Sequence, residues 1–166
     1  MSFGGFDPEI LQDFLTESGE LLDQLEADLV TLESTPSDPA LLNQVFRALH
    51  TIKGSASFLA LTNLVRIAHA SEGALNAARS GNAIIDRSAM DLLLQATDTI
   101  KRQMAQLREG SDLEVPDESL VTQLTVIAEG KAGAKDPAVS AAPVPAQAAA
   151  SVPTPPPVQA STAVAE

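Results

Sequence analysis

The sequence contains no cysteine, no tryptophan and no tyrosine among its 166 residues. The lack of cysteine excludes disulfide bonds and thiolate metal sites, so the redox compartment cannot be inferred from cysteine usage. No apolar run approaches the roughly 20 residues that a membrane-spanning helix needs, so we expect no membrane insertion. Residues 1–7 lack the basic segment and following apolar stretch of a secretory signal. The simplest interpretation is a cytoplasmic protein.

Basic residues are also scarce, with 10 Lys and Arg against 22 Asp and Glu, and the net charge is −12. Binding a nucleic acid requires Lys and Arg to replace condensed counterions, so this balance argues against a nucleic-acid partner. An acidic surface suits a basic protein partner, or serves solubility alone. All five phenylalanines fall within the first 58 positions, so the folded part must begin near the N-terminus.

The first segment with a helical pattern follows Asp7. Asp7 can cap a helix, Pro8 suits the first helical position, and Glu9 complements the positive end of the helix dipole. Residues at steps of three and four then form one stripe, in which Ser18 is the only polar member. The stripe comprises Leu11, Leu15, Ser18, Leu22, Leu25, Leu29 and Leu32. The pattern predicts one long amphipathic helix that ends at Thr35-Pro36.

Four further helices are predicted from the same signals. The second opens at Asp38-Pro39, the third near Thr62 as a plausible cap, the fourth at Asp86 and the fifth at Pro116-Asp117-Glu118. Glycines are expected to end the last three helices, the first of them in the left-handed conformation. They are Gly81, Gly110 and Gly130. The third helix shows a stripe of Leu61, Val65, Ala68, Glu72 and Leu75.

These patterns predict an all-α fold, an up-down-up-down four-helix bundle with a fifth C-terminal helix. We expect this domain to span residues 1–130. Residues 131–166 hold seven of the eleven prolines, many alanines and no aromatic residue, which is typical of a disordered Ala/Pro-rich linker. Because linkers usually connect folded parts, we expect the sequence to be the N-terminal portion of a longer protein.

The second helix carries the first candidate site residues. Its apolar stripe passes through Leu49 and Ile52, so His50 lies on a flank of the helix, with Lys53 one turn further along the same face. Gly54 costs about 1 kcal/mol relative to alanine inside a helix. It either clears space beside the imidazole of His50 or permits close helix packing.

The third helix contributes Glu72, which occupies a position of the apolar stripe. A carboxylate facing a helix interface must find a partner or take up a proton. His50 and Lys53, on the neighbouring antiparallel helix, are natural partners, and His69 precedes Glu72 by three positions. We therefore expect two histidines, a lysine and a glutamate at one edge of the bundle.

Such a set suits phosphoryl transfer through histidine. A carboxylate that accepts from one imidazole N–H fixes the tautomer and raises the basicity of the other nitrogen, which is the role expected of Glu72. Lys53 would offset charge on the arriving phosphoryl group. A purely structural pair of Glu72 with Lys53 remains an alternative, as does a helical adaptor without chemistry. A metal site of His50, His69 and Glu72 is a third, although di-iron bundles repeat Glu-x-x-His on paired helices.

The stretch Phe46-Arg47-Ala48-Leu49-His50-Thr51-Ile52-Lys53-Gly54-Ser55-Ala56, followed by His69, Glu72 and the Arg79-Ser80-Gly81 turn, resembles a known domain. It is the histidine phosphotransfer domain that begins CheA-type chemotaxis histidine kinases, and the resemblance covers roughly residues 7–130. It implies that His50 is the phosphoacceptor and that Lys53, His69 and Glu72 form its hydrogen-bonded surroundings. The family more often has a second glycine at the position of Ser55.

The resemblance also implies partners in two-component signalling. The chain shows no glycine-rich nucleotide-binding arrangement beyond Gly4-Gly5. The ATP-binding domain of a CheA-type kinase, in the same chain or in a partner, would therefore donate the phosphoryl group. An aspartate in the receiver domain of a CheY-like response regulator would accept it, with Mg²⁺ supplied at that site. We expect no cofactor in this chain, and whether the chain belongs to an enzyme, a transferase, stays open.

Overall fold

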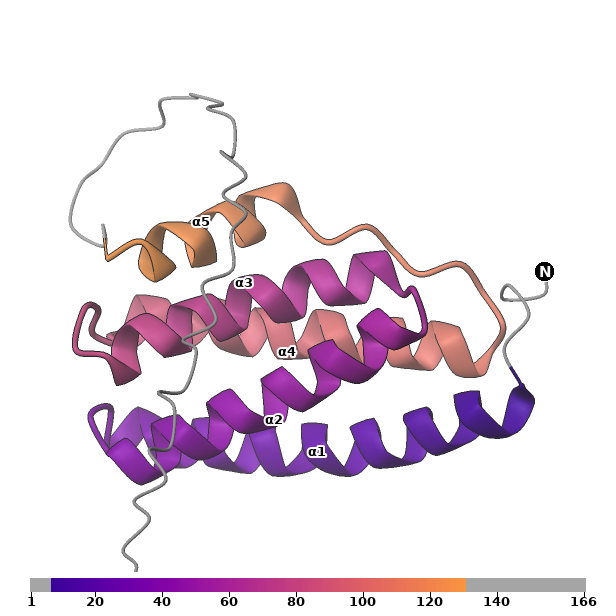
Figure 1. Ribbon diagram of the computed structural model, residues 1–166. Coiled ribbons are helices and arrows are strands. Elements are labelled where there is room, and N and C mark those ends of the chain that lie inside the picture. Colours follow the sequence, from indigo (N-terminus) through magenta and orange to yellow (C-terminus); the bar gives the residue numbers. More distant parts are fainter. Residues whose placement is uncertain (1–6, 131–166) are drawn as a thin grey trace, which may run out of the picture. The chain divides into compact units, whose positions relative to one another are not determined.

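The computed structural model describes residues 7–130, which form five helices and no strand. The helices are α1 (Pro8–Ser34), α2 (Pro39–Phe58), α3 (Thr62–Arg79), α4 (Arg87–Arg108) and α5 (Glu118–Ala128) (Figure 1). The predicted all-α class is therefore confirmed. None of the helices in this range combines the length and apolarity that a membrane crossing requires. Gly4-Gly5 and the predicted linker over residues 131–166 lie outside the described residues.

Four of the helices begin at an aspartate whose carboxylate accepts from backbone amides of the first turn. Asp7 accepts from the Glu9 amide at 2.9 Å. Asp38, Asp86 and Asp117 cap α2, α4 and α5 in the same way. The predicted starts of these four helices are confirmed, because each aspartate satisfies amides that would otherwise lack a partner.

Helix α3 begins at Thr62, as predicted, but its cap differs from the prediction. The N-cap residue is Leu61 rather than Thr62, and no side chain caps this helix. The turn between α2 and α3 is very short, and the Leu61 amide still donates to the Ala56 carbonyl at 2.9 Å. Leu61 thus ends one helix and starts the next while its side chain is buried, so an apolar residue occupies the cap position.

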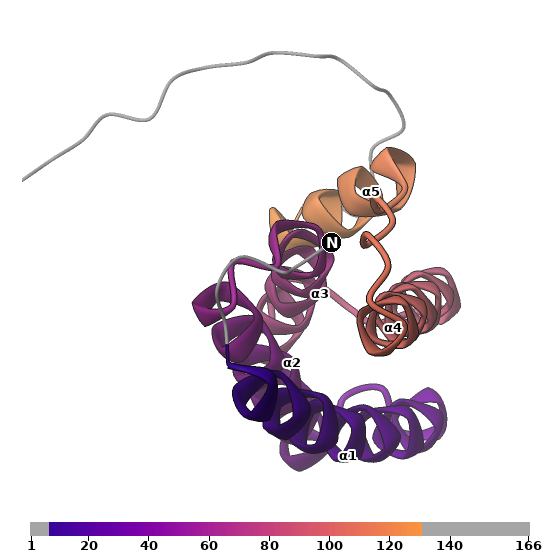
Figure 2. The ribbon, with the colours of Figure 1, turned by 90° about the vertical axis from the view of Figure 1, so that its right-hand side faces the viewer.

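The first four helices form a closed bundle (Figures 1 and 2). In this bundle α1 packs against α2 and α4, and α3 packs against the same two helices on the opposite side. Consecutive helices are therefore neighbours, as the predicted up-down-up-down order requires. The fifth helix lies outside this ring, against α3 and α4.

The core is built from aliphatic side chains of all five helices. Each fully buried Leu or Ile contributes about 1.5–3 kcal/mol relative to an exposed position. The stripe predicted for α3 was partly wrong, since Val65 is only half-buried while Leu64 and Ile67 are fully buried. The reason is that α3 contacts three helices, α2, α4 and α5, so its buried surface is wider than one stripe.

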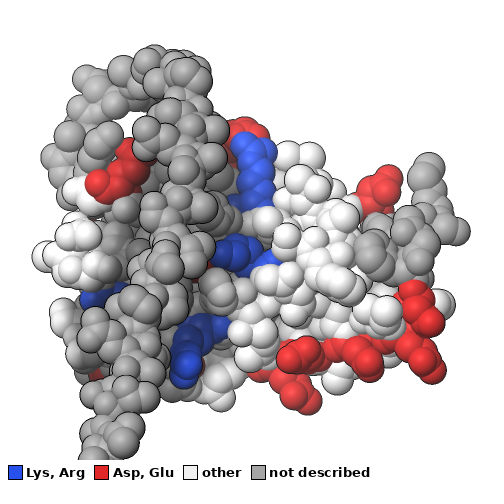
Figure 3. Space-filling view, in the orientation of Figure 1, with Lys and Arg blue, Asp and Glu red and all other residues white. Residues whose placement is uncertain are grey.

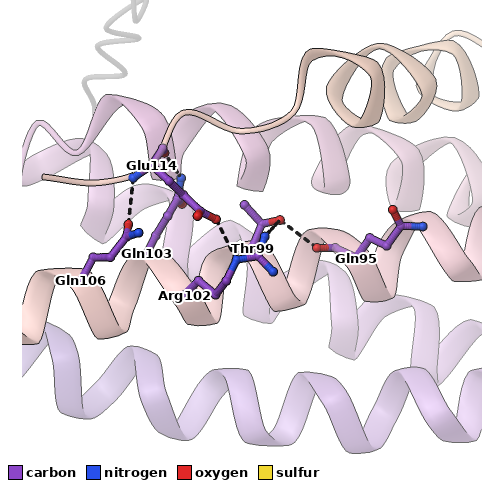
Figure 4. Close-up of polar contacts among 6 residues, drawn as sticks. All are labelled: Gln95, Thr99, Arg102, Gln103, Gln106 and Glu114. Carbon is purple, nitrogen blue, oxygen red and sulfur yellow. Dashed lines mark hydrogen bonds and ion pairs between the residues drawn. The ribbon is translucent and has the colours of Figure 1, made fainter.

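Side chains of α4 hold the segment that leads from α4 to α5 (Figure 4). Gln103 Nε2 donates to the Glu114 carbonyl and Gln106 Oε1 accepts from the Glu114 amide, both at 2.8 Å. Arg102 Nε contacts Glu114 Oε1 at 2.9 Å.

At the far end of α5, Ala128 Cβ lies 3.0 Å from where a Cβ on Gly73 would stand. The glycine thus allows α5 to approach α3 directly beside Glu72.

Candidate functional site

His50 projects from the outer side of α2. The neighbouring Leu49 and Ile52 are buried in the core, while 62% of the His50 side chain is exposed. Because α2 turns by about 100° per residue, a residue next to the buried stripe points along the flank of the bundle. The imidazole is therefore fixed on a rigid helix and open to an incoming group.

Glu72 reaches His50 from α3. Each of the two residues is eleven positions away from Leu61, at the turn between the antiparallel helices, so they stand at the same height along the bundle. Glu72 Oε1 lies 2.7 Å from His50 Nδ1. The glutamate side chain is only 11% exposed, so its carboxylate is held at the helix interface beneath the imidazole.

Lys53 completes the cluster from α2. Its Nζ lies 2.5 Å from Glu72 Oε2, so the two side chains form an ion pair. Burial of Glu72 opposes its ionisation. The hydrogen bond from His50 and the close positive charge of Lys53 outweigh burial, and the pKa of Glu72 is lower than its usual value. The carboxylate is therefore ionised at neutral pH.

This geometry selects one tautomer of His50. An ionised carboxylate can only accept a hydrogen bond, so the proton between Glu72 and His50 belongs to Nδ1. Nε2 then carries the lone pair of the neutral imidazole, on the far side of the ring from Glu72. The site presents a nucleophilic nitrogen to solvent and a buried negative charge behind it.

Gly54, one turn after His50 on α2, is surrounded by open space. A Cβ added at this position would meet no atom within 4 Å, so the alternative that Gly54 permits close helix packing is wrong. Gly54 instead lines a groove of about 380 Å³ between α1 and α2. The groove is apolar at Phe14 and Leu59, and Asp13 and Glu17 stand at its α1 side.

The structure does not bring His69 into the hydrogen-bonded cluster. His69 is exposed on α3, and within residues 7–130 it makes no hydrogen bond or ion pair with His50, Lys53 or Glu72. The same range contains no group of three or more His, Cys, Asp or Glu placed to hold a metal ion. The metal-site alternative therefore gains no support from the described residues.

Sequence reasoning missed two side chains that contact the site. The Phe46 ring stacks on the His50 imidazole, with 5.9 Å between ring centroids and 19° between the planes. The Arg79 guanidinium lies over the same phenyl ring, 4.0 Å from its centroid. The i, i+4 spacing of Phe46 and His50 was the available signal. Arg79 gave none, because it arrives from the end of another helix.

The fold and the cluster define a class of protein: an all-α bundle that presents an exposed histidine, hydrogen-bonded to a buried carboxylate, on a helix flank. The chain belongs to the Hpt domain family, whose model matches residues 9–110. It is 47% identical over 105 residues to the sensor histidine kinase CheAY of Helicobacter pylori, covering 63% of this chain and 13% of that protein. It is 32% identical over 116 residues to the chemotaxis protein CheA of Treponema pallidum, covering 70% and 14%.

Solved structures show the same fold. The CheA phosphotransferase domain from Thermotoga maritima is 33% identical, with a TM-score of 0.60, covering 63% of this chain and 99% of that one. The phosphorylated P1 domain of CheA3 from R. sphaeroides, solved in complex with CheY6, is 29% identical with a TM-score of 0.65, covering 73% and 97%. The chain thus corresponds to one whole domain but spans only about 13–14% of the two curated relatives named above.

Proposed function

We propose that His50 accepts a phosphoryl group from the ATP-binding domain of a CheA-type histidine kinase and passes it to an aspartate of a response regulator. One observation carries this proposal: His50 Nδ1 is hydrogen-bonded to the Glu72 carboxylate, while the rest of the imidazole is exposed. Membership of the Hpt domain family and similarity to CheA phosphotransfer domains support it.

In the first step, His50 Nε2 attacks the γ-phosphorus of ATP held by the kinase. A bond from Nε2 to phosphorus forms, the bond from phosphorus to the bridging oxygen breaks, and ADP leaves with that electron pair. Because Nδ1 keeps its proton, the ring becomes cationic. The ionised Glu72 stabilises this charge at a position where it develops, which lowers the barrier. In the second step an aspartate oxygen attacks the phosphorus and Nε2 recovers its lone pair.

The other members of the cluster assist His50. Lys53 lies one turn beyond His50 and neutralises part of the charge on the phosphoryl oxygens, in addition to pairing with Glu72. Gly54 leaves room beside the ring for the donor and acceptor proteins.

The partners supply what this chain does not need to bind. ATP belongs to the kinase domain, and Mg²⁺ belongs to the receiver domain of a CheY-like regulator, where carboxylate oxygens hold it. We propose that the full protein is a cytoplasmic histidine kinase whose later domains follow residue 166. The chain itself would then be its phosphotransfer module.

The test is incubation with an active CheA-type kinase and ATP labelled at the γ-phosphate. The proposal requires label that is stable in base, labile in acid, absent from His50→Gln, and transferable to a response regulator with Mg²⁺. A helical adaptor would bind these proteins and stay unlabelled. Label that persists in His50→Gln and is lost in His69→Gln would move the acceptor to His69.

A further inference from the structure

The charge of the bundle is divided sharply between its helices. Helix α1 carries eight acidic residues and no Lys or Arg, whereas α2 carries two basic residues and no acidic one. Residues 39–79 contain four basic residues and one acidic residue, a net charge of +3 in a chain of net charge −12. The basic residues of this range are Arg47, Lys53, Arg66 and Arg79.

Figure 3 shows this division on one face of the molecule. Basic side chains lie in the middle of the face, over α2 and α3, and a row of acidic side chains follows α1 along the lower edge. His50 lies on α2, which carries two basic residues and no acidic one. The acidic overall composition therefore misrepresents the surface around the candidate nucleophile.

Two of these four cations already have acidic partners. Lys53 pairs with Glu72, and Arg66 pairs with Glu118 at 2.5 Å. Arg47 is exposed, and its guanidinium forms no ion pair or hydrogen bond within residues 7–130. Arg79 contacts only neutral groups there, namely amide oxygens and the Phe46 ring. Arg47 and Arg79 thus retain uncompensated charges.

Both of these charges lie close to His50. Arg47 precedes His50 by three positions on the same helix, a spacing that places side chains on one face. The Arg79 guanidinium carbon is 4.0 Å from the Phe46 centroid, which is 5.9 Å from the His50 centroid. The carbon is therefore at most 9.9 Å from the imidazole centre, within about one Debye length (~10 Å) at 0.1 M salt.

Arg79 is also held in place. Its two terminal nitrogens donate to Asn43 Oδ1 at 3.2 Å and Asn76 Oδ1 at 3.0 Å, while its plane covers Phe46. A fixed guanidinium loses little side-chain entropy when it meets a partner carboxylate. On the other side of His50, beyond Gly54, Asp13 and Glu17 of α1 border the groove. The sign of the surface charge therefore reverses across the histidine.

We propose that Arg47 and Arg79 form a cationic docking surface that receives the carboxylate-rich surface of the protein that accepts the phosphoryl group. This inference rests on the proposed function. Proteins usually hold Mg²⁺ through one or two carboxylates, so we expect the acceptor aspartate of a Mg²⁺-dependent receiver to stand beside a further carboxylate. Such a surface is attracted to the Arg47 and Arg79 side of His50 and repelled from α1, so the charge boundary selects one docking orientation.

The test measures transfer from the labelled chain, residues 1–166, to a response regulator receiver domain with Mg²⁺, as a function of receiver concentration. At about 50 mM salt, Arg47→Ala should reduce kcat/KM about threefold and Arg47→Glu about tenfold, the scale expected for a charge at the rim of an interface. The rate at saturating receiver should change less than twofold. At about 500 mM salt the differences should nearly vanish because exposed charges are screened.

Arg87→Ala and Arg87→Glu are the matched controls, since Arg87 is an exposed cation at the start of α4, a helix that packs against α1, α3 and α5 rather than α2. They change the net charge equally and should leave kcat/KM unchanged. Arg47→Lys, which keeps the charge, should retain most of the wild-type kcat/KM. Equal effects of Arg47→Glu and Arg87→Glu, or a loss that salt does not reduce, would overturn the docking surface. A wild-type chain that never gains label on His50 would instead overturn the proposed function.

Discussion

Two polar clusters lie on opposite parts of the bundle and use similar groups differently. The first joins His50, Lys53 and Glu72 between α2 and α3. The second joins Gln103 and Glu114, with Arg102 and Gln106, between α4 and the segment that leads to α5 (Figure 4). In the second cluster, side chains of α4 form hydrogen bonds with both the amide and the carbonyl of Glu114, so these polar groups bind other parts of the same chain.

The difference lies in what each cluster leaves open. The second cluster ties a loop to a helix and directs no reactive atom to solvent, and the Gln103 Oε1 atom that lacks a partner there is buried. In the first cluster, one ring nitrogen of His50 is hydrogen-bonded to the buried Glu72 carboxylate, and the remainder of the ring is exposed. We therefore expect substitutions in the first cluster to change the rate of phosphoryl transfer, and substitutions in the second to change stability.

The largest effect is expected from His50→Gln. Removing the nucleophilic nitrogen should abolish labelling by a CheA-type kinase. The melting temperature measured by circular dichroism should stay within the error of the measurement, because the side chain is mostly exposed. Labelling above background in this variant would mean that the first cluster is not the acceptor site.

Glu72→Gln separates the mechanistic role of Glu72 from the structural alternative. If the carboxylate stabilises the cationic ring, the substitution should slow initial labelling by about 10² or more while the fold survives. If Glu72 only pairs with Lys53, stability should fall by about 1 kcal/mol or more, because both side chains are mostly buried, and labelling should remain nearly normal. Labelling rate and thermal stability are measured on the same sample.

Gln103→Leu should give the opposite pattern. Gln103 is fully buried, and its loss leaves the Glu114 carbonyl without its donor, which should lower the free energy of unfolding by about 1–3 kcal/mol. The labelling rate should not change. Gln123→Leu, at an exposed position of α5, is the control and should stay within about 0.5 kcal/mol of the wild type. A Gln103→Leu variant with a reduced labelling rate would show that the two clusters are coupled.

The pH dependence of stability gives a smaller effect with a defined sign. The pKa of Glu72 is lower in the folded protein than its ordinary value of 4.5. Its contribution is therefore fully present above pH 4.5 and is lost as the pH falls through the folded-state pKa. The difference in melting temperature between wild type and Glu72→Gln should therefore shrink as the pH falls below 4.5. A difference that does not shrink in acid would contradict the assigned ionisation.

Deleting residues 131–166 should have the smallest effect. Their composition, rich in proline and alanine, offers too little apolar surface to offset the entropy of ordering. The melting temperature and both transfer rates should match those of the full chain. A decrease of several degrees would show that this part of the chain stabilises the bundle and would shift the predicted boundary at residue 130.

Most of the fold could be predicted from local signals. Aspartates at the helix starts and stripes of leucine determined four of the five N-terminal caps, because capping and amphipathic periodicity act over a few residues. The start of α3 near Thr62 was also predicted, but its cap could not be found in this way. There a buried leucine replaces a capping side chain, and its burial depends on how α2 and α3 pack.

Part of the site could be predicted because one charged residue interrupts an apolar stripe. Glu72 broke an apolar stripe and so indicated a partner on the facing helix. The roles of Arg47 and Arg79 depend on the charges of neighbouring helices and on the end of α3, and these become visible only when the helices are placed together. His69 shows the converse: its spacing from Glu72 is right, but its ring points to solvent.

The stacking of Phe46 on His50 should make the two histidines distinguishable by NMR. The chain has two histidines and neither tryptophan nor tyrosine, so its aromatic proton spectrum is sparse. The phenyl ring current should displace the imidazole signals of His50 from those of the exposed His69. The two rings can then be followed separately by NMR without an added label, in an unmodified chain, while phosphate arrives at one of them and departs again.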